Sequence, residues 1–311
     1  MYDVIVLGSG PAGYTAALYT SRAFLKTLIL TGQEVGGQLT TTTDVENYPG
    51  FAHGIQGPQL VEDMKKQAER FGAEIKVDTV IKVEFSALPF KIHTADAVYE
   101  AKSVIIATGA SAKYLGLPSE ERLRGKGVSA CATCDGFFFR DKDVVVIGGG
   151  DTAMEEATFL TRFASRVTII HRREEFRASP IMLERAKKDP KIAFLTNKEV
   201  VEFVGESALA GVKLRDVVTG EETEIATQGA FLAIGHKPST DFLGDAVLRD
   251  EKGYIAVSEG KGPLEPKTQT SVPGVFVAGD CADPRYRQAI VAAGQGCMAG
   301  MDAEKWLAEK G

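Results

Sequence analysis

Residues 2–13 read Tyr2-Asp3-Val4-Ile5-Val6-Leu7-Gly8-Ser9-Gly10-Pro11-Ala12-Gly13, an apolar run that ends in a G-x-G-x-x-G turn. Helix-compatible sequence follows from Tyr14 to about Phe24, and residues 27–31 read as a second strand. Strand, glycine turn, helix and strand in this order are typical of a dinucleotide-binding fold. The glycines let a pyrophosphate approach backbone N–H groups at a helix N-terminus.

The same pattern returns in the middle of the chain. Residues 143–147 form a second apolar run, and residues 148–153 give G-x-G-x-x-A. A helical stretch then continues to about Arg162, and residues 166–170 read as the next strand. A lone motif is often only a tight turn, whereas two framed copies favour two separate nucleotide sites. The predicted fold class is therefore α/β, with two Rossmann-like dinucleotide-binding domains.

The strand ends after the two turns differ in charge. The second copy is followed by His171-Arg172-Arg173, with Arg177 close behind. Guanidinium groups bind phosphate bidentately, so arginines there favour the 2′-phosphate of NADPH over the ribose of NADH. The alternative is a solvated basic patch paired with neighbouring glutamates. The first copy has Thr31-Gly32 at this position, so the usual acidic ribose ligand stays uncertain there.

Between and after the two turns, the chain reads as further short strands and a closing helix. Residues 74–100 alternate as short strands, and a helix is expected from about Gln288 to Trp306. Further apolar runs end in small-residue turns at residues 103–110, 229–235 and 275–280. The last of these ends in Gly279-Asp280, which could bring a carboxylate close to a ribityl phosphate chain. The polar residues 118–126 are interpreted as a connector.

Composition limits the classes of function. At 311 residues, two domains are expected, and a net charge of −6 does not favour a nucleic-acid binder. The N-terminus has no basic region of the kind that opens a signal peptide, and no apolar stretch approaches the ~18 residues of a membrane span. We therefore expect a cytoplasmic protein. Four cysteines are too few for a disulfide framework, so a close pair is more typical of catalysis or metal binding.

That close pair is Cys131-Ala132-Thr133-Cys134. On a helical turn this spacing brings both sulfurs to one side, and a helix N-terminus would lower the pKa of the first thiol. Asp135 could carry the proton of thiol–disulfide exchange, although a solvated turn acid is the alternative. Zinc would need two more ligands, and Cys281 and Cys297 form no second C-x-x-C pair. We predict no metal site, and expect those two cysteines to be buried.

The pair precedes the second glycine turn, so the thiols belong to the second nucleotide domain. The expected division is a domain of residues 1–113 and 240–311 and a second domain of residues 114–239. The thiol pair and the nicotinamide would both have to approach the cofactor bound by the first domain, and Cys131 would also have to reach an outside protein. One fixed arrangement of the two domains can hardly allow all three contacts. We therefore expect the second domain to rotate on connectors near residues 112–117 and 236–240.

Taken together, these segments resemble the low-molecular-weight thioredoxin reductases of bacteria. The resemblance is carried by residues 8–17, 36–43, 45–50, 107–110, 131–138, 171–173 and 286–289. It implies a homodimeric FAD enzyme that passes electrons from NADPH to thioredoxin. It also implies that Cys134 faces the flavin, that Cys131 attacks thioredoxin and that Asp135 is the acid–base group. Two departures are Phe139, where tyrosine is commoner, and Cys281, where an aliphatic residue is common.

The resemblance also implies two sets of cofactor-binding residues. FAD would be held by Gly8, Ser9, Gly10, Pro11, Ala12, Gly13, Thr31, Gly32, Gln33, Glu34, Val35, Gly36, Gly37, Gln38, Asn47, Gly279, Asp280, Arg287, Gln288 and Ala289. NADPH would be held by Gly148, Gly150, Asp151, Thr152, His171, Arg172, Arg173 and Arg177. Two alternatives remain: a reductase of another thioredoxin-like or peroxiredoxin-system protein, and a non-catalytic redox-sensing flavoprotein.

Overall fold

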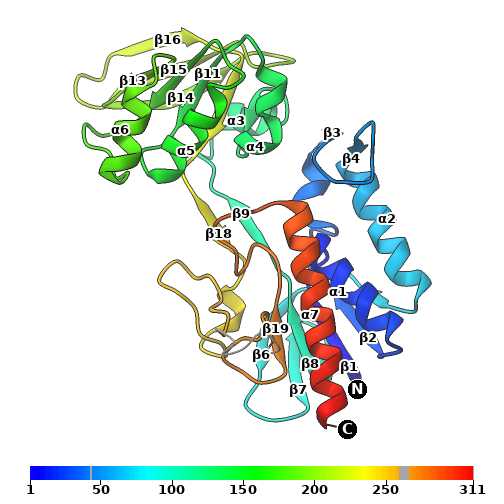
Figure 1. Cartoon of the computed structure of the whole chain (residues 1–311). Coiled ribbons are helices and arrows are strands. Elements are labelled where there is room, and N and C mark those ends of the chain that lie inside the picture. Colours follow the sequence, from blue (N-terminus) through cyan, green and yellow to red (C-terminus); the bar gives the residue numbers. More distant parts are fainter. Residues whose placement is uncertain (43, 259–265, 311) are drawn as a thin grey trace. The chain divides into compact units, whose positions relative to one another are not determined.

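The computed structural model describes residues 1–42, 44–258 and 266–310, and the chain divides into two compact units. The first comprises Met1–Ser111 and Lys237–Gly311, and the second comprises Ala112–His236 (Figure 1). The sequence placed these boundaries after residues 113 and 239. Thr43, which belongs to one of the segments behind the resemblance, lies outside the described residues, as do residues 259–265 of the expected first domain.

The opening stretch forms the centre of the sheet in the first unit. β1 (Tyr2–Leu7) pairs in parallel with β2 (Thr27–Leu30) on one side and β8 (Val98–Ile106) on the other. β5 (Glu74–Lys76) extends the sheet beyond β2, and β19 (Val275–Val277) pairs in parallel with β8. This arrangement confirms the predicted parallel sheet and brings the Gly279-Asp280 strand end beside the first glycine turn.

Two antiparallel strands complete this sheet, within residues 74–100, where the sequence predicts short strands. β6 (Val80–Glu84) and β7 (Phe90–Thr94) form a meander with β8. The two faces of this sheet belong to separate hydrophobic cores, because successive side chains of β1 point to opposite faces. Val4 and Val6 pack under the helices, whereas Ile5 and Leu7 pack on the opposite face.

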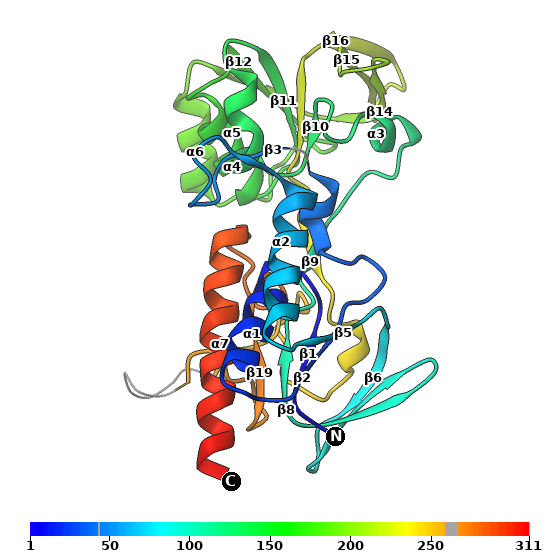
Figure 2. The ribbon, with the colours of Figure 1, turned by 90° about the vertical axis from the view of Figure 1, so that its right-hand side faces the viewer.

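Three helices cover one face of this sheet. They are α1 (Pro11–Arg22), α2 (Gly57–Arg70) and the closing helix α7 (Ala289–Lys310), drawn together in front of the strands in Figure 2. α1 begins with Pro11 in its first turn, where a missing N–H costs nothing. The sequence predicted α1 and α7 but not α2. Shorter elements of this unit are η1 (Gly37–Thr41), β3 (Asp44–Val45), β4 (Ile55–Gln56) and η3 (Asp241–Leu243).

The second unit repeats the plan around the second glycine turn. β11 (Asp143–Ile147) lies between β12 (Arg166–Ile170) and β17 (Gly229–Leu232) in parallel pairs. β10 (Val128–Ser129) and β13 (Ile192–Leu195) form the two edges of this sheet. Both edge strands also pair in parallel with their neighbours, so all five strands of the sheet run in parallel. The expected fold class, α/β with two Rossmann-like dinucleotide-binding domains, is confirmed.

Helices cover one face of the second sheet and a small antiparallel sheet covers the other. Valines that alternate along β11 pack against α5 (Asp151–Leu160) and α6 (Pro180–Lys188). The opposite face packs on a meander that the sequence did not predict, formed by β14 (Lys198–Val204), β15 (Gly211–Asp216) and β16 (Glu222–Ala226). Phe203 and Leu214 of the meander are fully buried there.

The polar segment 118–126 corrects one expectation. Its polar composition predicts a connector, but α3 (Pro118–Leu123) is a helix with Leu123 in the core. Glu120 is only 1% exposed, and its two carboxylate oxygens accept hydrogen bonds from the backbone N–H groups of Leu115 (3.0 Å) and Gly116 (2.8 Å). A buried carboxylate is tolerated when backbone donors satisfy it.

The two units are joined by a pair of strands. β9 (Ala110–Ala112) and β18 (His236–Pro238) form a two-stranded ladder. The expected rotation points, near residues 112–117 and 236–240, therefore coincide in sequence with the unit boundaries. Glu120 anchors the far end of the first connector in the second unit.

Candidate functional site

Cys131 and Cys134 form a disulfide in the second unit, with their Cα atoms 5.3 Å apart. Cys131 is the N-cap of α4 (Ala132–Asp135), a single helical turn that continues into η2 (Gly136–Phe139). The backbone N–H of Cys131 donates to the Ser129 hydroxyl at 3.0 Å. Cys134 is exposed and Cys131 is half-buried. The predicted helical turn thus holds both sulfurs on one side and leaves the pair open to reagents.

Asp135 lies directly after the pair and is half-buried. Burial raises the pKa of the Asp135 carboxyl above its ordinary value, and a hydrogen bond from Ser129 partly offsets this shift. The backbone N–H of Asp135 donates to the carbonyl oxygen of Cys131 at 3.1 Å. A carboxyl whose pKa is raised beside a dithiol keeps its proton to a higher pH than an exposed aspartate does, which suits a group that passes protons to thiols.

The three phenylalanines after the pair divide between core and surface. Phe139 is buried and packs edge-to-face on Phe231, with ring centroids 5.2 Å apart. Phe139, which stands where tyrosine is commoner, is therefore a core residue that makes an aromatic contact. Phe137 is 54% exposed and Phe138 is 42% exposed, so both remain at the surface beside the thiols.

The first glycine turn is built by close backbone approach. A Cβ at Gly8 would lie 2.3 Å from the carbonyl oxygen of Ala107, and one at Gly13 would lie 2.1 Å from that of Gly8. Both glycines are therefore required sterically, whereas the Cβ direction of Gly10 is open within 4 Å. That open side faces no protein atom, as a phosphate-binding loop at the start of α1 needs.

The turn is tied to the predicted FAD loop at residues 31–38. The Ser9 hydroxyl donates to the carbonyl oxygen of Thr31 at 3.3 Å and accepts from the N–H of Gly36 at 2.9 Å. Gly37 lies over Gly10, since its Cβ would be 3.5 Å from the Cα of Gly10. The remaining loop members, Gly32, Gln33, Glu34, Val35 and Gln38, lie between or beside these anchors.

A half-buried carboxyl, that of Asp280, lies just beyond the end of β19. Burial, then the negative charge of Asp283, raises the pKa of Asp280 to about 6. The positive charge of Arg287 acts in the opposite direction on the pKa of this carboxyl. Gly279 packs on α1, with its Cβ direction 3.0 Å from the Cβ of Ala12. A carboxylate beside the glycine turn can accept hydrogen bonds from a hydroxyl-bearing chain such as the ribityl group of FAD.

Cys281, next to this carboxyl, is a buried thiol. It is fully inaccessible, and its Sγ donates to the carbonyl oxygens of Ala278 (3.4 Å) and Ile106 (3.6 Å). Burial raises the pKa of Cys281 to about 11, so it does not compete as a nucleophile. Cys297 corrects the other half of this expectation, because it lies on α7 and is only half-buried.

Predicted FAD residues from distant parts of the sequence meet at the start of α7. The Asn47 amide donates to Oε1 of Gln288 at 3.3 Å. Arg287 has a left-handed φ of 49°, and Ala289 is the first residue of α7. This contact, the first glycine turn and Asp280 all belong to the first unit. The donor set and the open side of the turn fit a bound dinucleotide.

The second glycine turn has the same construction. Gly148 has a φ of 157°, and its Cβ would lie 2.4 Å from the carbonyl oxygen of Ala233. Gly150 has open space on its Cβ side, at the N-cap of α5. Asp151 and Thr152 begin α5, and the Asp151 carboxylate accepts from the N–H of Ser179 at 2.7 Å. The turn therefore offers a free helix N-terminus for a pyrophosphate.

The arginines beyond β12 lie on the loop that Asp151 holds. Arg172, Arg173 and Arg177 are all exposed. In the described part of the chain, none of the three pairs with Glu174 or Glu175, so the alternative of a self-neutralised basic patch loses its support. Three exposed guanidinium groups beside a glycine turn fit a 2′-phosphate. His171, by contrast, is 6% exposed and turned inward.

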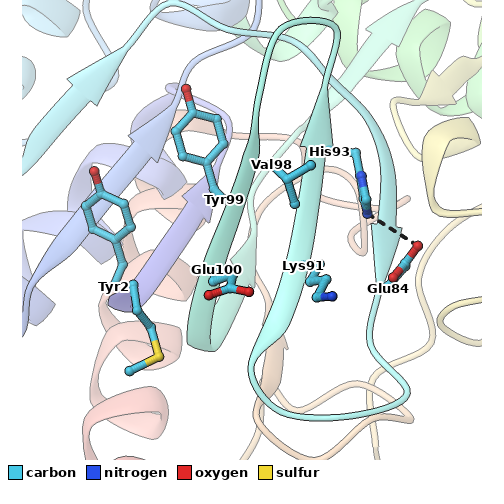
Figure 3. A pocket seen from close by; sticks show the side chains of 8 residues that line it. Tyr2, Glu84, Lys91, His93, Val98, Tyr99 and Glu100 are labelled. Atoms are coloured by element: carbon cyan, nitrogen blue, oxygen red, sulfur yellow. Dashed lines mark ion pairs between the residues drawn. The ribbon is translucent and has the colours of Figure 1, made fainter.

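A pocket of about 520 Å³ lies on the first unit (Figure 3). It is lined by Met1, Tyr2, Glu84, Lys91, His93, Val98, Tyr99 and Glu100. Nε2 of His93 lies 3.3 Å from Oε1 of Glu84 within it. None of these residues belongs to the glycine turns or the disulfide, so the pocket is not part of the predicted site.

No group of three or more His, Cys, Asp or Glu side chains is arranged to hold a metal ion among residues 1–42, 44–258 and 266–310. Over the same residues, no helix is both long and apolar enough to cross a bilayer.

The sequence and the fold are similar to those of known thioredoxin reductases. A family described as pyridine nucleotide-disulphide oxidoreductase matches residues 2–296. Thioredoxin reductase of Mycolicibacterium smegmatis is 55% identical over 310 residues, which cover 100% of this chain and 98% of that protein. The bifunctional thioredoxin reductase/thioredoxin of Mycobacterium leprae (strain TN) is 54% identical, over 99% of this chain and 66% of its own length. The structure of thioredoxin reductase from Giardia duodenalis superposes with a TM-score of 0.93 at 41% identity, covering 99% of both chains.

One similar protein has a different name. Glucosaminate ammonia-lyase of Pseudomonas fluorescens is 51% identical over 98% of this chain and 95% of its own length. Overall identity alone therefore does not name the reaction, and the Cys131–Cys134 disulfide carries that part of the argument. Thioredoxin reductases of this family use FAD and NADPH. The chain belongs to the thioredoxin reductases of the pyridine nucleotide-disulphide oxidoreductase family.

Proposed function

We propose that this protein takes electrons from NADPH and reduces the disulfide of thioredoxin through its own Cys131–Cys134 pair. The observation that carries the proposal is an accessible disulfide beside a half-buried carboxyl, in the unit that also holds the arginine-flanked glycine turn. FAD, when bound by the first unit, supplies the two-electron relay between NADPH and the disulfide. Elimination of ammonia involves no net oxidation or reduction, whereas reduction of a protein disulfide does, so the Cys131–Cys134 pair favours the reductase.

The thiol chemistry balances with two electrons and two protons. These break the S–S bond and leave Cys131 and Cys134 as thiols. The Cys131 thiolate attacks one sulfur of the thioredoxin disulfide, which forms a mixed disulfide and releases the other sulfur as a thiolate. Cys134 then attacks Sγ of Cys131, which frees reduced thioredoxin and restores the internal pair. The order of the two cysteines rests on the family resemblance, since Cys134 is the more exposed of the two here.

Asp135 is proposed to hold the proton that moves during these exchanges. Asp135→Asn is expected to slow thioredoxin reduction by about 10²-fold or more, because a positioned acid–base group contributes at least that much. The dependence of kcat on pH that belongs to this carboxyl should disappear as well. Because burial raises its pKa, Asp135 stays protonated to a higher pH than an exposed aspartate does.

Steady-state rates of Asp135→Asn and of the control Asp143→Asn, measured across pH, check this prediction. Asp143 is an exposed aspartate at the start of β11, so the control should behave as the parent protein does. An Asp135→Asn profile that matches the parent profile in height and shape would show that the carboxyl carries no proton.

The surface beside the thiols is proposed to receive thioredoxin. Phe137 and Phe138 expose their rings there, and the exposed Lys126 belongs to the same unit. Exposed aromatic side chains are enriched in protein interfaces. The partner that supplies the disulfide would cover these rings while Cys131 reacts.

The second unit is proposed to rotate on the connectors at residues 112–117 and 236–240. The disulfide and the second glycine turn ride on one unit, whereas the first glycine turn and Asp280 belong to the other. Both the disulfide and the nicotinamide must reach the flavin in turn. Movement about two short connectors is a known form of gating.

We further propose a homodimer that works in the cytoplasm. Apolar side chains on α1, α7 and the turn after α1 remain exposed in the single chain: Tyr19, Phe24, Met298 and Met301. α1 and α7 pack against each other, so these side chains lie on neighbouring elements that a second copy could cover. The free thiols of Cys281 and Cys297 suit a reducing compartment.

Differential alkylation tests the proposed electron path within the chain. The oxidised holoprotein is alkylated, then reduced with NADPH alone under nitrogen and alkylated with a second reagent. The proposal expects the second label on both Cys131 and Cys134, and none on the buried Cys281. A peptide that stays unlabelled after NADPH is consumed would show that electrons do not reach the pair.

A further inference from the structure

The middle glycine of the second turn lies directly against a histidine ring. A Cβ at Gly149 would be 2.3 Å from Cε1 and 2.4 Å from Nδ1 of His171. Real side-chain atoms do not approach so closely, and the backbone of Gly149 is not left-handed. The need for glycine at this position is therefore steric, and its cause is the His171 ring.

Two contacts hold the His171 ring in this position. It stacks on Phe176, with centroids 5.0 Å apart and planes 25° apart. Its Nε2 lies 3.1 Å from the carbonyl oxygen of Glu175, which only accepts, so Nε2 carries the hydrogen in this contact. Burial, with the nearby arginines, lowers the pKa of His171, so the ring is neutral at physiological pH. A neutral ring with one nitrogen occupied is a poor phosphate ligand.

The segment that follows the histidine folds back on the same glycine. The backbone N–H groups of Arg177 and Ala178 donate to the carbonyl oxygen of Gly149 at 2.7 Å and 3.1 Å. Ser179 donates to the carboxylate of Asp151 at 2.7 Å. The glycine turn and the arginine loop are thus one hydrogen-bonded body, and the His171 ring fills the space between them.

We propose that His171 is a positioning residue whose ring sets the spacing between the second glycine turn and the arginine loop. It thereby builds the selectivity for a 2′-phosphate without contacting the phosphate. The inference rests on the proposed function, in that the second unit is taken to bind NADPH. It differs from the expectation that His171 is itself one of the cofactor ligands.

This geometry predicts an unusual pattern among variants. His171→Ala removes the spacer, and the arginine loop should collapse toward the turn. Gly149→Ala inserts a methyl group where the ring lies and should push the loop away. In the double variant the methyl group occupies the vacated space. The two losses should therefore not add, because residues in contact deviate from additivity.

The test measures binding of 2′,5′-ADP and of 5′-AMP to the full-length holoprotein by titration calorimetry. The 2′-phosphate preference is the ratio of the two affinities. Each single variant is expected to lower this preference by about tenfold, within the range of coupling between residues in contact. The double variant is expected to be no worse than either single variant. Losses that multiply in the double variant would overturn the proposal.

A further variant, His171→Phe, distinguishes a spacer role of His171 from a role as a phosphate ligand. His171→Phe keeps a stacked ring but has no ring nitrogen, so a spacer role expects the 2′-phosphate preference to stay within about threefold of the parent value. A ligand role expects His171→Phe to be as weak as His171→Ala, and that outcome contradicts the proposal. Flavin content and melting temperature, measured alongside, identify any variant that fails to fold.

The controls also keep the inference apart from the proposed function. Arg172→Ala should abolish the 2′-phosphate preference both in the parent protein and in the His171→Phe variant, because the proposal places the Arg172 guanidinium group at the phosphate itself. A parent protein that binds 2′,5′-ADP and 5′-AMP equally would refute the NADPH site. A parent with a clear preference that none of the Gly149 or His171 variants changes would refute the spacer alone.

Discussion

Replacing Cys131 with serine is expected to abolish reduction of thioredoxin while NADPH still reduces the bound flavin. The thiolate is the attacking group in disulfide exchange, and a serine hydroxyl is not ionised at neutral pH. The loss should be at least about a thousandfold, since removal of a nucleophile costs enzymes several orders of magnitude. Flavin reduction is followed by absorbance in stopped flow, and thioredoxin reduction by steady-state oxidation of NADPH.

Two matched variants sharpen this prediction. Cys297→Ser changes a half-buried free cysteine and should leave both rates unchanged. Cys134→Ser should stop the cycle at a stable mixed disulfide between Cys131 and thioredoxin, because the resolving thiol is missing. If the trapped disulfide instead forms through Cys134 in Cys131→Ser, the order of the two cysteines is reversed. Persistent turnover by Cys131→Ser would remove the pair from the path altogether.

The second large effect is expected from Arg172→Ala combined with Arg173→Ala. These guanidinium groups are exposed beside the second glycine turn, and within the described residues neither forms an ion pair with Glu174 or Glu175. Loss of bidentate contacts to a phosphate costs on the order of a few kcal/mol, so KM for NADPH should rise by about a hundredfold. KM for NADH should hardly change, since NADH has no 2′-phosphate. Steady-state kinetics with both nucleotides checks the difference.

The control for charge is Arg215→Ala, on β15 of the same unit. Arg215 lies 3.8 Å from Glu199 and 3.6 Å from Glu222, in ion pairs at the surface. Its loss should leave both Michaelis constants as they are, since an exposed pair contributes little. If the double arginine variant weakens NADPH and NADH equally, the arginines do not read the phosphate.

The two glycine turns could be predicted from sequence because their constraint is local. An apolar strand followed by G-x-G-x-x-G or G-x-G-x-x-A leaves few alternatives, and the structure places both at the ends of β1 and β11. The disulfide spacing was equally local, as one helical turn decides whether two sulfurs meet. Charge and spacing along the chain were sufficient in these cases.

Features that depend on distant partners were not predicted. The segment around Glu120 reads as a polar connector, because the backbone donors of Leu115 and Gly116 that satisfy it are fixed only in the folded chain. In the sequence, His171 is the first residue of the basic segment His171-Arg172-Arg173 and is expected to bind the cofactor. Its ring is buried because Gly149 has no side chain to occupy the same space. The meander of β14, β15 and β16 carries no motif, and only its packing on β11 explains it.

The most direct test of the central claim is thioredoxin reduction by the purified holoprotein, with NADPH and NADH compared at equal concentration. The account predicts rapid oxidation of NADPH only when oxidised thioredoxin is present, with two thiols formed on thioredoxin for each NADPH consumed and little turnover with NADH. NADPH oxidation that is independent of thioredoxin, or thioredoxin that stays oxidised while NADPH is spent, would contradict it.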